Sequence, residues 1–192
     1  AIPRQLASRL PQDAIRLNSP VAAVNPGEVT LASGEVLRAR QVVIATDAEI
    51  TNRLAPASGE EPKKWRSVVG LYFSAPKSPL DEPIIALNGE DAGLVNNVCA
   101  VSDVAPPYAP RDRALISVSV LGLPDHERLE EEVRTELRNW FGSQVDRWEH
   151  LRSDMIPRAL PEQRPGRGPR NSPAYRERNG IIICGDHCTT AS

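Results

Sequence analysis

The clearest indication of the fold is Gly180-Ile-Ile-Ile-Cys-Gly-Asp-His-Cys-Thr-Thr-Ala-Ser192, the last residues of the sequence. The short apolar run 181–184 predicts a strand that is buried on both faces, as in a parallel sheet. Gly185 permits a tight turn or a close backbone approach, and Asp186 adds a side chain that only accepts hydrogen bonds. The small polar residues 189–192 suit the start of a helix. This order presents a carboxylate and free backbone N–H groups at the end of a sheet, where α/β proteins bind ligands.

A stretch near the start of the chain repeats this pattern. Residues 41–46 (Gln-Val-Val-Ile-Ala-Thr) predict a second buried strand ending in small residues, and Asp47 is suited to cap a helix over residues 48–54. Because each strand needs a neighbour to be buried, we expect the two strands to lie in one sheet, with residues 56–155 outside it. The sequence ends where the last helix would begin, so we expect a longer protein.

The residues before this second strand predict a small antiparallel meander. A helix over residues 2–10 comes first and is ended by Pro11. The expected strands are 14–18, 21–24, 29–31 and 36–37. Turns are expected at Asn25-Pro-Gly27 and at residues 32–35, where a glycine lies in the turn.

The middle block, residues 56–155, has a different sequence pattern and predicts a mostly antiparallel sheet covered by one helix. The expected strands are 67–73, 83–87, 93–101, 114–121 and 145–156. The helix is expected over residues 126–141, capped by Asp125 and closed by Gly142. An extended connection over 156–161 and a loop over 162–179 lead to the final strand. We therefore predict an α/β protein, α+β overall, with one domain from residues 1–55 and 156–192 and a second from residues 56–155.

Composition narrows the class of protein. The chain has 192 residues, of which 40% are apolar and 25% charged, as in a globular domain. A net charge of −2 gives no reason to expect nucleic acid or an anionic membrane as a partner, although residues 162–179 are rich in arginine. Three cysteines form no disulfide framework, which indicates a reducing compartment. No apolar run approaches the ~20 residues that span a bilayer.

Other kinds of site fit the sequence less well. Cys184, His187 and Cys188 have a C-x-x-H-C spacing, but a structural zinc site needs four ligands, and Cys99 lies in a different block. We therefore expect no metal site. No G-x-S-x-G motif is present to supply a serine nucleophile. His187 stays open as a general base, and the catalytic residues stay unknown.

Eight short motifs follow one another along the chain: IPRQLASRLP (2–11), IRLNSPVAAV (15–24), VVIATD (42–47), LYFSAP (71–76), Asn96-Asn97, VAPPYAP (104–110), NWFG (139–142) and CGDHCTTAS (184–192). Together they resemble the later part of an FAD-dependent oxidoreductase of the flavin-containing amine oxidase and phytoene desaturase superfamily. The resemblance is greatest to phytoene-desaturase-like or amine-oxidase-like proteins of plants and cyanobacteria, and it covers nearly the whole chain.

The resemblance implies an FAD-binding, Rossmann-like domain that is interrupted by a substrate-binding sheet. Gly185 would let the backbone approach FAD, and Asp186 would contact its ribityl or pyrophosphate part. The backbone near Val21 would hold the adenine side. The turn residues Ala45, Thr46 and Asp47 would lie near the cofactor. Tyr72 would be the first candidate to line the substrate pocket.

The resemblance also implies what is missing. In that family a G-x-G-x-x-G motif stands at the N-terminus, and none follows a strand in this sequence. We therefore expect an incomplete FAD site, which the chain alone would not bind tightly. The intact protein would transfer a hydride from a small hydrophobic or amine substrate to flavin. The alternative is a catalytically inactive interaction or scaffold domain. We expect a cytoplasmic protein, or a plastid protein if a transit peptide was removed, with the electron acceptor and oligomeric state open.

Overall fold

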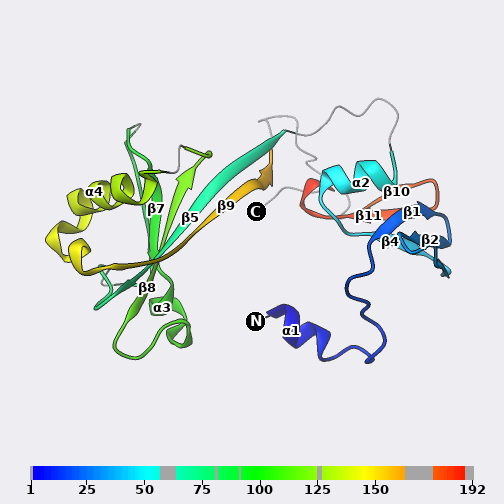
Figure 1. Cartoon of the computed structure of the whole chain (residues 1–192), viewed down its shortest axis with the longest axis horizontal. Coiled ribbons are helices and arrows are strands. Elements are labelled where there is room, and N and C mark those ends of the chain that lie inside the picture. The colour runs from blue at the N-terminus through cyan, green and yellow to red at the C-terminus, as the bar shows by residue number, and fades with distance from the viewer. Residues whose placement is uncertain are drawn as a thin grey trace. The chain divides into compact units, whose positions relative to one another are not determined.

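The computed structural model describes residues 2–56, 64–80, 82–90, 92–124, 127–162 and 175–188. The chain divides into two compact units: unit 1 is Ala1–Lys63 with Gln163–Ser192, and unit 2 is Lys64–Glu162. Both units contain helices and sheets (Figure 1), which confirms the predicted α/β class, α+β overall. In the described parts of the chain, no helix is both long and apolar enough to cross a membrane.

Unit 1 begins with the short exposed helix α1 (Ile2–Ala7) and continues into a meander. The meander has the order β1-β2-β3 and consists of β1 (Val21–Asn25), β2 (Glu28–Leu31) and β3 (Val36–Arg38). Both of its turns lie where the sequence predicts them. The predicted strand over 14–18 is wrong, because these residues form no strand and Asn18 adopts φ 53, a left-handed conformation that ends an extended run.

The second sheet of unit 1, called the central sheet below, pairs a strand from the first quarter of the chain with strands near its last residues. Strand β4 (Val42–Ile44) pairs in parallel with β11 (Ile181–Cys184), and β10 (Tyr175–Arg178) lies antiparallel on the other side of β11. This confirms that the two predicted strands share one sheet. It also confirms that the described strands of the middle block belong to another sheet.

Burial of this sheet is one-sided, which corrects the prediction that β11 is buried on both faces. Ile181 and Ile183 are buried and pack in a cluster with Ala55 and Cys188, whereas Ile182 is half-buried. The neighbouring Val43 is 54% exposed on the same open side. One face therefore packs against the end of α2 (Ala48–Leu54), which lies above the sheet in Figure 1.

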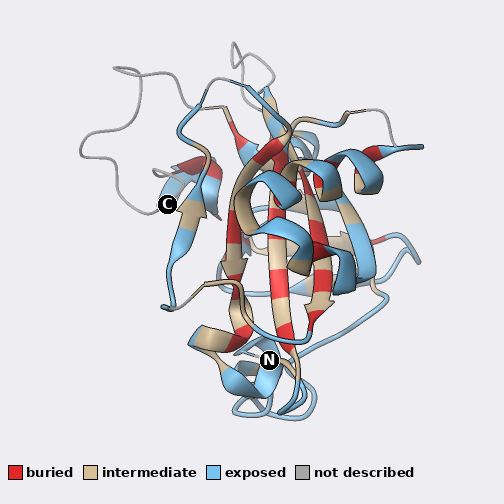
Figure 2. Ribbon diagram, turned by 90° about the vertical axis from the view of Figure 1, so that its left-hand side faces the viewer, coloured by how far each residue is buried: buried red, intermediate tan, exposed pale blue. Residues whose placement is uncertain are grey.

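Unit 2 is built on a five-stranded sheet in which every neighbouring pair is antiparallel, as predicted. Its order is β6-β7-β8-β5-β9, from β5 (Trp65–Ala75), β6 (Ile85–Leu87), β7 (Val95–Ala100), β8 (Ala114–Leu121) and β9 (Glu149–Pro161). The helix α4 (Leu129–Phe141) covers one face, where the buried residues of the strands gather (Figure 2). The core there includes Phe73, Ile116 and Leu137.

Several boundaries in unit 2 differ from the prediction. Helix α4 begins at Leu129 with Arg128 as its N-cap, which makes no side-chain capping bond, and it ends at Gly142 as predicted. Residues 142–147 form a 3₁₀ helix, η2, so β9 begins at Glu149 and not at residue 145. The strand then continues through residues 156–161, which were predicted to be a connection outside the sheet. Pairing with β5 explains this extension, because Leu160 lies beside Arg66.

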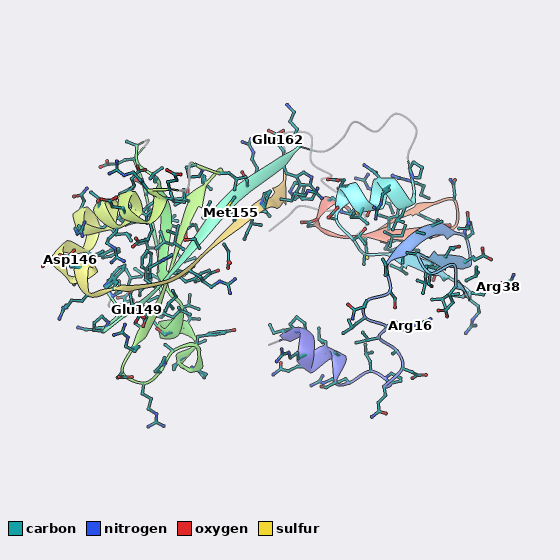
Figure 3. The ribbon with its side chains drawn as sticks, in the orientation of Figure 1. Arg16, Arg38, Asp146, Glu149, Met155 and Glu162 are labelled. Carbon is teal, nitrogen blue, oxygen red and sulfur yellow. The ribbon has the colours of Figure 1, made fainter. Side chains whose placement is uncertain are left out.

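Arginine side chains connect elements of unit 2. Arg66 at the start of β5 contacts Glu162, the residue that follows β9, at 2.9 Å. Figure 3 labels Glu162. Arg134 of α4 donates to the backbone carbonyls of Val145 and Trp148, each at 2.9 Å. Its guanidinium carbon lies 5.3 Å from the centre of the Phe73 ring. Arg134 therefore ties the helix to the segment that follows it.

Short helices complete the structure. They are α3 (Val101–Val104), η1 (Pro106–Tyr108) and η3 (Asp186–Cys188). The predicted cap Asp125, the loop residues 57–63 and 163–174, and the helix start over 189–192 lie outside the described residues.

Candidate functional site

Two turns meet at one edge of the central sheet of unit 1. Because β4 and β11 are parallel and Ile183 lies beside Ile44, the residues that follow each strand emerge at the same edge. Ala45, Thr46 and Asp47 follow β4, and Gly185 and Asp186 follow β11. The predicted cofactor-binding residues other than Val21 are thereby gathered in one place.

Gly185 lies close to the turn that follows β4. Its φ is +146°, and a Cβ atom added there would lie 3.3 Å from the Thr46 carbonyl oxygen. The same atom would lie 2.9 Å from both Cε1 and Nδ1 of the His187 ring. These distances leave no room for a side chain, so the glycine is required by both backbone conformation and space. The sequence predicts that this glycine allows a close backbone approach, but it does not indicate that the approach is to Thr46.

The two carboxylates at this edge have different environments. Asp47 Oδ1 accepts hydrogen bonds from the backbone N–H groups of Glu49 and Ile50, both at 2.9 Å, and so caps α2 as predicted. The Asp186 side chain is 46% exposed, and its Oδ1 lies 3.7 Å from His187 Nδ1. Asp186 therefore presents acceptor oxygens to solvent, whereas one Asp47 oxygen is already engaged by the helix.

The neighbouring ring and thiol are buried beneath the turn. His187 is 8% exposed, and Cys188 is fully buried with its Sγ 3.8 Å from the carbonyl oxygen of Ile183. The described residues contain no group of three or more His, Cys, Asp and Glu side chains placed to hold a metal ion.

Val21 lies in a different part of unit 1. It lines an open groove of about 390 Å³ together with Leu31, Val42 and Val43. Val42 and Val43 are the first residues of β4, so this groove lies beside the amino end of the strand and not the turn after it. Val21 also begins β1, an outer strand of the meander, at an irregularity in the pairing with β2.

Tyr72 lies on β5 in unit 2, on the face of the sheet opposite α4. It is opposite Ser117 on β8 and Arg152 on β9. Its neighbour Phe73 points the other way and is fully buried against Trp148 in the core. The alternation of strand residues thus separates the two aromatic rings that follow one another in the sequence.

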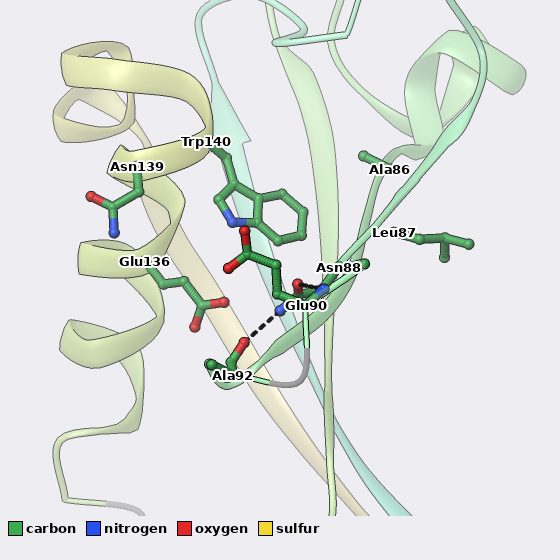
Figure 4. A pocket seen from close by; sticks show the side chains of 10 residues that line it. Ala86, Leu87, Asn88, Glu90, Ala92, Glu136, Asn139 and Trp140 are labelled. Carbon is green, nitrogen blue, oxygen red and sulfur yellow. Dashed lines mark hydrogen bonds between the residues drawn. The ribbon is translucent and has the colours of Figure 1, made fainter.

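The sequence did not reveal a pocket on the α4 side of unit 2. It has a volume of about 580 Å³ and lies between the β6–β7 hairpin and the end of α4 (Figure 4). Glu136, one of the two carboxylates that line it, accepts from the backbone N–H groups of Leu94 at 2.7 Å and Val95 at 3.2 Å. Gly93 allows this approach, because a Cβ there would lie 2.4 Å from Glu136 Oε1. Glu136 therefore serves to fasten the hairpin to the helix.

The chain matches a family model in sequence and resembles solved structures in fold. The model of the family described as flavin containing amine oxidoreductase matches residues 1–192. No curated protein sequence matches the chain. A reduced UDP-galactopyranose mutase aligns with a TM-score of 0.64 and 13% identity, over 82% of this chain and 39% of that chain. A candidate protoporphyrinogen oxidase from Exiguobacterium sp. 255-15 aligns with a TM-score of 0.64 and 16% identity, over 87% of this chain and 40% of that chain.

A protein from Pyrococcus furiosus aligns with a TM-score of 0.59 and 15% identity, over 88% of this chain and 40% of that chain. At these identities the alignments show a shared fold. The chain spans about two fifths of the length of these structures. The match of the family model over all 192 residues shows that the chain belongs to the family of flavin-containing amine oxidoreductases.

Proposed function

We propose that the chain is part of an FAD-dependent oxidoreductase in which unit 1 contributes to the cofactor site and unit 2 holds the substrate. Membership of the flavin-containing family supports this proposal. FAD, when bound, would supply the acceptor for a hydride from the substrate. The observation that carries the proposal is the close approach of Gly185 to Thr46 at the carboxyl ends of two parallel strands.

The residues of this edge suit different parts of the cofactor. Gly185 has no side chain, so a ligand can approach the backbone of the turn. The exposed Asp186 carboxylate would accept hydrogen bonds from ribityl hydroxyls, since a carboxylate would repel the pyrophosphate. Ala45 and Thr46 would lie along the same part of the cofactor, and Asp47 would hold their turn through its cap on α2.

The remaining assignments belong to the same proposal. The backbone at Val21, on an outer strand of the meander, would hold the adenine side of FAD. Tyr72 would face the substrate from the open side of the unit 2 sheet. We assign no catalytic residue, and the intact enzyme would act on a small molecule.

Titration with FAD tests the cofactor assignment. We expect the purified chain to quench flavin fluorescence on binding and to shift the visible absorbance bands. Asp186→Asn should weaken binding about tenfold, as expected for loss of a hydrogen bond to a charged group. Asp13→Asn, at an exposed position in the same unit, is the matched control. Equal affinity of the two variants would contradict the role of Asp186.

A second candidate is an interaction or scaffold domain without catalytic activity. The observation that favours it is the absence of a G-x-G-x-x-G motif after any strand of residues 1–192. Under this alternative, the chain takes up no FAD even at millimolar cofactor. Stoichiometric uptake of FAD would exclude this alternative.

A further inference from the structure

The two faces of the unit 2 sheet differ in polarity. Along β5, Leu71 and Phe73 are buried under α4, whereas the alternating residues Gly70 and Tyr72 are half-buried on the other face. Strand β8 alternates in the same way, and Ser119 lies opposite Gly70. The face opposite α4 therefore presents polar groups in the middle of the sheet.

The strand register arranges these groups in two rows. The first row crosses four strands and contains Asn97, Ser119, Gly70 and Asp154. The second row crosses the same strands and contains Cys99, Ser117, Tyr72 and Arg152. None of these eight residues is buried.

The Tyr72 ring leans toward the first row. A Cβ atom added at Gly70 would lie 3.6 Å from the Tyr72 hydroxyl oxygen and 3.7 Å from its Cε2. The missing side chain at Gly70 therefore leaves room for the ring and brings its hydroxyl toward Ser119 and Asp154, the neighbours of Gly70 in its row.

The rows carry no net charge. Arg152 donates from Nε to Asp154 at 3.0 Å, so the single cation and the single anion of the rows neutralise each other. Asp154 also raises the pKa of Arg152. Burial raises the pKa of the Cys99 thiol, which keeps it protonated at neutral pH. The rows thus offer hydroxyl, amide and phenol groups, which suit a neutral hydrogen-bonding partner better than an ion.

An apolar cluster borders the first row on the same face. Val68 lies opposite both Leu121 and Ile156, and it precedes Gly70 by two residues on β5, on the same face of the sheet. Leu121 is 66% exposed and Ile156 is 41% exposed. A ligand that covers both regions must therefore be apolar at one end and carry neutral polar groups at the other.

We propose that the substrate held by unit 2 is a small molecule with an apolar body and a neutral hydroxyl, carbonyl or amide group, which binds across the face opposite α4. This inference rests on the proposed function, in which unit 2 holds the substrate. A hydrocarbon such as a polyene fits the face poorly, because it would remove water from the serine, asparagine and tyrosine groups without replacing their hydrogen bonds. The polar group lies near Tyr72 and the apolar body near Leu121 and Ile156.

Farnesol and farnesene test this inference, because they share an apolar body and differ in one hydroxyl. Each is titrated into the ¹⁵N-labelled chain without flavin, and binding is followed by amide chemical shifts. Farnesol should perturb residues 68–72 and 117–121 and bind about tenfold more tightly than farnesene. Tyr72→Phe should weaken farnesol binding about fivefold, as expected for one hydrogen bond, and leave farnesene binding unchanged. Tyr108→Phe is the control, since Tyr108 is 65% exposed on η1 and belongs to neither row.

The outcomes separate this inference from the flavin proposal. Equal binding of the two probes, shifts confined to other residues, or no binding of farnesol up to its solubility limit would each overturn the inference. An equal effect of Tyr72→Phe and Tyr108→Phe would also overturn it. A chain that binds farnesol on this face but takes up no FAD would support the ligand class and count only against the cofactor assignment.

Discussion

Replacing Gly185 with alanine should loosen the edge of the sheet where β4 and β11 end. The backbone at φ +146° is one that L side chains rarely adopt, which costs about 1–3 kcal/mol. The new methyl group would also stand 2.9 Å from two atoms of the His187 ring and 3.3 Å from the Thr46 carbonyl oxygen, and overpacking of this kind costs about 1–3 kcal/mol. The backbone cost and the overpacking cost do not add in full, because a shift of the turn that relieves one also relieves part of the other. We therefore expect a loss of about 3 kcal/mol in local stability.

Hydrogen exchange measured by mass spectrometry reports this loss directly. At about 1.4 kcal/mol for each factor of ten, amides of residues 181–188 should exchange roughly a hundredfold faster in Gly185→Ala. Gly34→Ala is the matched control. Its φ is +88°, but no atom lies within 4 Å of an added Cβ, so it bears only the backbone cost of about 1–2 kcal/mol around its own turn.

The comparison has a clear refuting result. If Gly185→Ala exchanges within about threefold of the wild-type chain over residues 181–188, the two turns do not approach closely in solution. A local loss no larger than that of Gly34→Ala would also show that the contacts with Thr46 and His187 yield without cost.

The other predictions concern helix packing, charge and capping. Arg134→Met leaves two backbone carbonyls without their donor and should lower the free energy of unfolding by about 3 kcal/mol in urea, followed by tryptophan fluorescence. The more exposed Arg138→Met should cost under about 1 kcal/mol, and equal losses would contradict the role of Arg134. The hydrogen bond from Arg16 holds the pKa of Glu35 below its usual range, so this contact stabilises the fold at neutral pH and is lost as pH falls through that depressed pKa. Arg16→Gln should raise the Glu35 pKa to its ordinary value in a carboxyl NMR titration, and an unchanged value would refute the pairing. Asp47→Ala should destabilise α2 by about 1 kcal/mol and Asp47→Asn by much less, measured by exchange of the α2 amides; equal losses would argue against the cap.

Local signals predicted the elements that depend on few residues. Asp47 is an N-cap because its carboxylate reaches N–H groups two and three residues along the chain. The strand 114–121 was predicted with its observed bounds, because Ser117 and Ser119 alternate with apolar residues at the two-residue period of a strand. The pairing of β4 with β11 followed from the need of each apolar run for a neighbour.

Errors arose where distant residues decide the outcome. Residues 156–161 lack a strong strand pattern and contain prolines, but pairing with β5 keeps them extended as the end of β9. The run 14–18 has strand-like composition, but the left-handed backbone of Asn18 breaks it. Arg16 instead pairs with Glu35 in the turn between β2 and β3. Helix α4 begins later than its apparent cap indicates.

Sequence patterns alone were enough to identify the family, to predict that β4 and β11 share a sheet, and to predict the turn residues that follow these two strands. These rest on short apolar runs and on glycine and acid positions, whose preferences act within a few residues. The folded structure was needed to show that Gly185 lies against Thr46, that His187 is buried beneath the turn, and that two polar rows, one of which contains Tyr72, cross the unit 2 sheet. The reason is that register and close approach arise from packing between segments far apart in the chain, which no local preference specifies.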